Sequence, residues 1–103
     1  PETKSGATSA WAQYTVQFKY RDSLRSLLTK SGIPTRIFYS DPVHAQPAYG
    51  SYLLASGDVP VATSASLQVL SLPIYPYLDA STQDRIVAST ISAIKSLRDG
   101  EER

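Results

Sequence analysis

The chain has 103 residues, of which 42% are hydrophobic and 18% charged, as expected for one folded domain with a single core. Its formal net charge is +1 and basic residues are scattered among acidic ones, so no nucleic-acid-binding surface is predicted. The lack of cysteine excludes disulfides and thiolate metal sites. No apolar run approaches the ~20 residues that cross a bilayer, and no signal peptide is evident, so we expect a cytoplasmic protein without a membrane partner.

The first residues are small and polar, and they do not begin with methionine. Such a start is typical of a segment cut from an exposed part of a longer gene product. We therefore expect residues 1–10 to be a polar leader or linker, residues 11–99 to form the domain and residues 100–103 to be a tail.

The first predicted unit is a strand, a helix and a second strand. Apolar and polar side chains alternate over residues 12–20, which predicts a half-buried strand. Asp22 is placed to cap a helix of about three turns, and Gly32 lies where a left-handed C-terminal cap is expected. Pro34 prevents the helix from continuing, and residues 35–39 are rich in β-forming residues, which predicts the second strand.

The middle of the chain is a long connection, residues 40–60, with frequent proline and glycine. Loops of this length in compact domains are often functional. Pro60 can begin a helix over residues 61–68, although threonine and serine favour helices weakly. Alternation over residues 70–74 predicts a short strand, with Pro73 at a sheet edge or where pairing ends.

The last element is predicted to be a long amphipathic helix. Residues 81–84 resemble a capping box with aspartate in place of the usual glutamate, and apolar residues then recur at helical spacing from Ile86 to Leu97. Gly100 is expected to end this helix, with residues 101–103 frayed. The whole order predicts an α+β fold of two layers, in which helices cover mainly one face of a short mixed or antiparallel sheet of about three strands.

The candidate functional side chains concentrate in the long loop. His44 is the single histidine, and it lies among groups that could hold a small molecule: Tyr39, Asp41, Gln46, Tyr49 and Tyr52. The alternative is a purely structural role, in which the tyrosines pack the loop on the sheet and His44 is either exposed or hydrogen-bonded within the core. The residues alone fit both interpretations.

Two other kinds of chemistry are not favoured by this loop. Ser40 or Ser51 could join His44 and Asp41 in a hydrolytic triad, but these neighbours lack the strained turn that presents a nucleophile. Asp41 and His44 could also ligate a metal, but two ligands do not make a coordination shell. We therefore predict no catalytic residue and no metal-binding residue.

Several short motifs stand in a fixed order along the chain. They are Trp11-Ala12-Gln13-Tyr14, Arg21-Asp22, Gly32-Ile33-Pro34-Thr35, the segment from Phe38 to Pro47 that contains His44 and Gln46, and Leu70-Ser71-Leu72-Pro73 before the last helix. In order and spacing, residues 10–97 resemble the C-terminal small domain of the DegT/DnrJ/EryC1/StrS family of pyridoxal-phosphate-dependent sugar aminotransferases. Two departures are Ser40, where the family has proline, and residues 62–68, which lack the family's charged side chains.

The resemblance implies a fold like the C-terminal domain of fold-type I aminotransferases. It also implies that His44, Tyr39 and Gln46 help to shape the pocket for a nucleotide-linked sugar. The parent would be a homodimer with active sites near the subunit interface, an amino donor such as glutamate and a nucleotide-activated keto-sugar acceptor. Its role would be in amino-sugar or cell-surface polysaccharide biosynthesis.

Such an enzyme needs a desolvated lysine that forms a Schiff base with pyridoxal phosphate. The lysines of this chain are all predicted in polar or solvent-facing positions: Lys4, Lys19, Lys30 and Lys95. We therefore expect no cofactor-binding residue here, and an inactive fragment whose N-terminal cofactor domain is missing. The alternatives are a free-standing α+β module that binds a small ligand and a dimerisation domain without catalysis.

Overall fold

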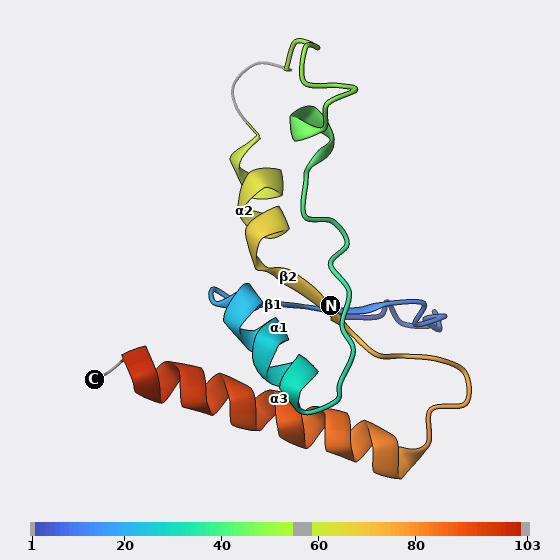
Figure 1. Cartoon of the computed structure of the whole chain (residues 1–103). Helices are drawn as coiled ribbons and strands as arrows, with labels where there is room; N and C mark the ends of the chain where they lie inside the picture. Colours follow the sequence, from blue (N-terminus) through green and yellow to red (C-terminus); the bar gives the residue numbers. More distant parts are fainter. Residues whose placement is uncertain (1, 55–58, 102–103) are drawn as a thin grey trace.

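A computed structural model describes residues 2–54 and 59–101 of the chain. Its elements in order are β1 (Tyr14–Gln17), α1 (Arg21–Lys30), the short 3-10 helix η1 (Val43–Ala45), α2 (Pro60–Gln68), β2 (Val69–Leu72) and α3 (Ala80–Glu101). β1 and β2 pair antiparallel, and α1 and α3 lie close to them, whereas α2 points away from both helices (Figure 1). The predicted α+β class is confirmed.

The sheet of the described residues has two strands, where we predicted about three. The predicted strand over residues 35–39 is reduced to one bridge, in which Arg36 and Ser71 exchange N–H···O bonds of 3.1 and 2.7 Å. The next pair in this register would place Pro34 opposite Pro73, and neither proline has an N–H to donate. In the other direction, the carbonyl of Val69 accepts a hydrogen bond from the Arg21 side chain instead.

β1 is also shorter than the strand predicted over residues 12–20. It has four residues, since its partner β2 has four, and one further bond of 3.0 Å joins the Phe18 N–H to the Gln68 carbonyl. Alternation nevertheless predicted the inner face correctly, because Val16 and Phe18 pack against the core. β2 covers Val69–Leu72 rather than residues 70–74, and it ends just before Pro73.

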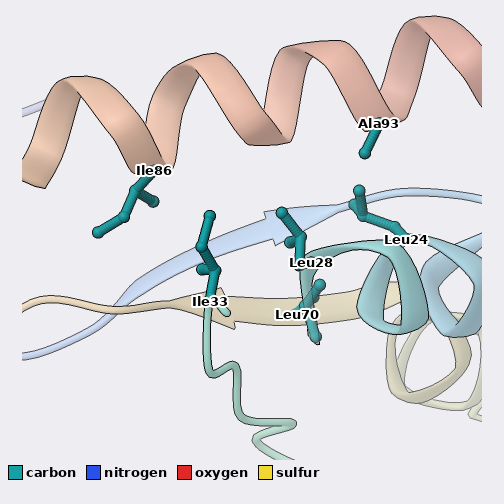
Figure 2. Packing of buried hydrophobic residues seen from close by; sticks show 6 residues of the cluster. All are labelled: Leu24, Leu28, Ile33, Leu70, Ile86 and Ala93. Carbon is teal, nitrogen blue, oxygen red and sulfur yellow. The ribbon is translucent and has the colours of Figure 1, made fainter. Parts of the chain in front are cut away.

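A small hydrophobic core joins α1, β2 and α3. Figure 2 shows two side chains of α3 pointing from above toward those of α1, β2 and the turn after α1; the set is Leu24, Leu28, Ile33, Leu70, Ile86 and Ala93. Each fully buried leucine or isoleucine contributes roughly 1.5–3 kcal/mol relative to exposure. The apolar spacings predicted for the first and last helices therefore identify Leu24, Leu28 and Ile86 correctly, whereas Val87 and Ile91 of the predicted stripe are 46% and 48% exposed.

Gly32 closes α1 in the left-handed conformation that the sequence predicts, with φ of +74°. Its N–H donates to the Thr29 carbonyl at 3.0 Å, and the Ile33 N–H donates to the Leu28 carbonyl at 2.9 Å. These are the two bonds of a Schellman cap. Because Ile33 and Leu28 are both fully buried, the cap also closes into the core.

The predicted N-terminal cap of α1 is wrong. The helix begins at Arg21, one residue before Asp22, and no side chain caps it. The carboxylate of Asp22 accepts a bond of 2.7 Å from Nε of Arg21 instead. The adjacent guanidinium competes successfully for this carboxylate, since a charged donor forms a stronger bond than a neutral backbone N–H.

The N-terminal cap of α3 is Asp79, not the box predicted over residues 81–84. Asp79 Oδ1 accepts the Thr82 N–H and the Ser81 hydroxyl, both at 2.7 Å. The Thr82 N–H, together with the hydroxyls of Ser81 and Thr82, holds the pKa of Asp79 below its ordinary value. The helix also continues past the predicted end at Gly100 to Glu101, whose carboxylate accepts hydrogen bonds from Lys19 and Tyr20, just before α1.

The long loop and α2 project from the rest of the chain, as Figure 1 shows. We call residues 38–54 and 59–68 the arm, and β1, α1, Ile33, β2 and α3 the body. The radius of gyration is 16.5 Å, against about 13 Å for a compact chain of this length. The accessible surface is 8030 Å², against roughly 5,700 Å² for a compact protein of 11.2 kDa. None of the helices in the described ranges is long and apolar enough to cross a membrane.

Candidate functional site

The arm borders a hollow of about 590 Å³ that is open to solvent. Residues of the long loop, η1 and the first turn of α2 line it: Tyr39, Asp41, Pro42, Val43, His44, Gln46, Tyr49, Tyr52, Leu53, Leu54, Val59 and Ala62. The structure therefore brings all three predicted site residues, Tyr39, His44 and Gln46, to one concave surface. Apolar walls with a few polar groups are typical of small-molecule sites.

His44 is half-buried in η1, and its ring faces α2. Its Nε2 lies 3.4 Å from the Thr63 hydroxyl, which donates its own proton to the Val59 carbonyl at 3.1 Å. In the tautomer that carries the ring proton on Nε2, the imidazole donates to the Thr63 hydroxyl. Nδ1 of the neutral ring is then an acceptor. The imidazole thus joins the loop to α2 and adds an acceptor to the site.

Gln46 holds the loop in its turn. Its side-chain Nε2 donates to the Asp41 backbone carbonyl at 3.4 Å. The backbone carbonyl of Gln46 accepts the N–H groups of Tyr49 and Gly50, both at 2.9 Å. These bonds satisfy backbone groups that have no partner in a helix or sheet. Gln46 therefore shapes the hollow through the backbone as well as lining it.

The tyrosines of the arm are exposed. Tyr39 keeps 70% of its surface accessible and Tyr52 keeps 73%, while the rings of Tyr49 and Tyr52 lie 6.2 Å apart. Rings that packed the loop onto the sheet would be buried. The structure therefore does not support a purely structural role for the tyrosines, and it leaves aromatic surface exposed at the hollow.

The described residues do not fit a pyridoxal phosphate site. The amine that forms a Schiff base must be partly desolvated and nucleophilic, yet the structure exposes each lysine: Lys4, Lys19, Lys30 and Lys95. The Tyr20 hydroxyl and the Glu101 carboxylate, 2.9 Å away, raise the pKa of Lys19, which disfavours the free amine. Residues 2–54 and 59–101 also hold no cluster of three or more metal-ligating side chains.

Sequence reasoning missed the contribution of α2 to the site. Thr63 and Ala62 come close to His44 only because the chain folds back on itself after the long loop. Threonine and alanine in a helix with weak amphipathic character give no functional signal. The spacing of the chain alone could not have paired Thr63 with His44.

The model of the DegT/DnrJ/EryC1/StrS aminotransferase family matches residues 1–91, so the chain belongs to this family. Over 89 residues it is 43% identical to the erythromycin biosynthesis sensory transduction protein EryC1 of Saccharopolyspora erythraea, covering 86% of this chain and 24% of that protein. Over 81 residues it is 38% identical to the UDP-2-acetamido-2-deoxy-3-oxo-D-glucuronate aminotransferase of Pseudomonas aeruginosa, covering 79% and 22%.

The fold is similar to a crystal structure of a DegT DnrJ EryC1 StrS aminotransferase from Brucella abortus. The TM-score is 0.82 at 42% identity, and the match covers 89% of this chain and 25% of that chain. The chain therefore spans about a quarter of the length of the relatives it matches.

Proposed function

We propose that the chain is the C-terminal small domain, residues 11–99, of a pyridoxal-phosphate-dependent aminotransferase that acts on a nucleotide-activated keto-sugar. The observation that carries this proposal is the arm hollow, which gathers His44, Tyr39 and Gln46 in a chain of this aminotransferase family. The chain supplies one wall of the sugar pocket, and the catalytic groups belong to the rest of the polypeptide.

The large exposed surface of the chain supports the proposal that a further domain packs against it. Its accessible area of 8030 Å² exceeds that of a compact protein of equal mass by roughly 2,300 Å², which is more than the about 800 Å² that each partner buries in a standard protein interface. Trp11 and Tyr14, each about half exposed, line an apolar hollow of about 300 Å³ with Val87 of α3. We infer that an N-terminal cofactor domain, and a second subunit of a homodimer, cover such surfaces.

The residues of the hollow suit a nucleotide sugar. Exposed rings such as Tyr39 and Tyr52 can stack on a base or cover the apolar face of a sugar. His44 offers Nδ1 as an acceptor for a sugar hydroxyl, and Gln46 holds the loop around it. Pyridoxal phosphate, held by the other domain, would supply the electron sink for amino transfer. A cytoplasmic location and a role in polysaccharide biosynthesis stay predictions.

Binding of a UDP-linked sugar to the complete polypeptide tests the proposed wall. Isothermal titration is expected to show that His44→Ala and Tyr39→Ala each weaken binding by about five-fold or more, the effect of losing roughly 1 kcal/mol. Leu67→Ala is the matched control, since Leu67 lies on α2, is exposed and does not line the hollow. Unchanged affinity in both site variants would show that the hollow is not part of the sugar pocket.

The isolated chain provides a second test. The proposal expects the parent polypeptide to be much heavier than 11.2 kDa by intact mass. It also expects the chain alone to form no yellow adduct with pyridoxal phosphate and to transfer no amino group. An isolated chain that forms the adduct and converts a ketone to an amine would overturn the proposal.

A further inference from the structure

Arg21 has a buried guanidinium at a place where its own helix does not favour a positive charge. It is the first residue of α1, and only 6% of it is exposed. The N-terminus of a helix carries partial positive charge, so a cation there is unfavourable. Burial adds a desolvation cost that must be offset by hydrogen bonds. The function of Arg21 should therefore be sought outside α1.

The guanidinium reaches the junction between α2 and β2. Its Nη1 donates to the Ser66 carbonyl at 3.0 Å and to the Val69 carbonyl at 3.1 Å, while Nε donates to the Asp22 carboxylate at 2.7 Å. Ser66 lies in the last turn of α2, where carbonyls lack helical partners and a cation is favoured. Arg21 thus completes the C-terminal end of α2.

Polar contacts of this kind hold α2 because hydrophobic packing does not. Ser66 is the one buried residue of α2, and Val61 and Leu67 are 81% and 62% exposed. Gln68 adds two more hydrogen bonds at the base of α2: its backbone carbonyl accepts the Phe18 N–H, just after β1, and its side chain accepts a bond from the Gln17 side chain. Arg21 is the buried and charged member of this set.

We propose that Arg21 is a positioning residue. It fixes the direction of α2 relative to the body, and α2 forms one side of the arm hollow. α2 brings Thr63 to His44 and Ala62 to the wall of the hollow. A change at the base of α2 therefore moves one wall of the site relative to the body. The effect on a nucleotide sugar rests on the proposed function, whereas the effect on α2 does not.

Hydrogen exchange of the complete polypeptide separates positioning from general stability. In Arg21→Gln, the amides of α2 are expected to exchange faster by about ten-fold or more, since charge-assisted bonds are lost. The amides of α1 and α3 around Leu24, Leu28 and Ala93 should change by less than about two-fold. Arg25→Gln is the matched control, because Arg25 lies one turn along α1, is exposed and makes no side-chain bond within the described ranges.

Binding gives the second measurement. Arg21→Gln should weaken the binding of a UDP-linked sugar by about five-fold or more, because the wall that offers hydrogen bonds is displaced. Arg25→Gln should leave this binding unchanged. Exchange that rises equally in α1, α2 and α3, or does not rise in α2, overturns the proposal. Local exchange in α2 without any sugar binding by the wild type would leave the positioning role intact and overturn the proposed function. If Arg21→Gln does not fold, Arg21→Lys is judged by the same criteria, since lysine cannot reproduce the planar donor pattern.

Discussion

The body and the arm are held together by different forces. In the body, Leu24, Leu28, Ile33 and Leu70 are fully buried among three elements, so many apolar contacts determine one arrangement. In the arm, Leu53 is fully exposed, and hydrogen bonds of single side chains set the shape. The candidate site therefore lies where the packing of this chain constrains conformation least. That is where a site completed by another domain is expected, because binding regions are commonly drawn from the less stable parts of a protein.

The largest effect should come from emptying the core of the body. Leu28→Ala is expected to lower the free energy of unfolding by about 2–5 kcal/mol, since it removes a fully buried side chain. Leu53→Ala, the same change at a fully exposed position of the arm, should cost less than about 0.5 kcal/mol. Urea unfolding followed by circular dichroism and by the fluorescence of Trp11 measures both. Equal losses would mean that the arm is packed as the body is.

The next effect tests the turn that closes α1 into the core. Gly32→Ala should cost about 1–2 kcal/mol, because an alanine at φ of +74° is strained although nothing lies within 4 Å of its Cβ. Gly100→Ala, inside the last turn of α3, is the control of opposite sign and should stabilise by up to about 1 kcal/mol. Thermal unfolding midpoints compare the two. A neutral Gly32→Ala would show that the turn relaxes to another cap.

A smaller effect should come from a buried hydroxyl at the border between body and arm. Thr35 is 8% exposed, and its hydroxyl is the one buried side-chain polar atom without a partner in the described residues. Thr35→Val should therefore stabilise the isolated chain by about 1 kcal/mol. Thr90→Val is the matched control, since the buried Thr90 hydroxyl donates to the Ile86 carbonyl at 2.7 Å. Destabilisation by Thr35→Val would reveal a partner for that hydroxyl.

The smallest effect is a pH dependence of the body. The Thr82 N–H lowers the pKa of Asp79 in the folded chain, so the unfolded chain binds more protons below about pH 4. The contribution of Asp79 is complete above that pH and is lost as the pH falls through the folded-state pKa. Asp79→Asn keeps an acceptor but does not titrate. Urea midpoints of wild type and variant should differ most near neutral pH and converge as the pH falls through the folded-state pKa of Asp79. A constant difference would contradict this assignment.

Much of the body could be predicted from the sequence because its signals are local. Alternation gave the inner face of β1, helical spacing gave the buried side of α1 and α3, and Gly32 gave the end of α1. The errors fell where groups compete. Asp22 pairs with Arg21 instead of capping α1, and Asp79 caps α3 instead of the predicted box. The predicted third strand is absent from the described residues because the observed register would place Pro34 opposite Pro73, and the sequence did not predict that register.

The sequence by itself determined the family, the α+β class and the loop that holds His44, Tyr39 and Gln46, because motifs, periodicity and turn residues are written in neighbouring positions. Only the tertiary structure decided that this loop meets α2 at Thr63, and that Arg21 closes the far end of that helix. Both contacts join residues distant in the chain through side-chain hydrogen bonds, and such pairs follow from where the elements are placed in space rather than from any local preference.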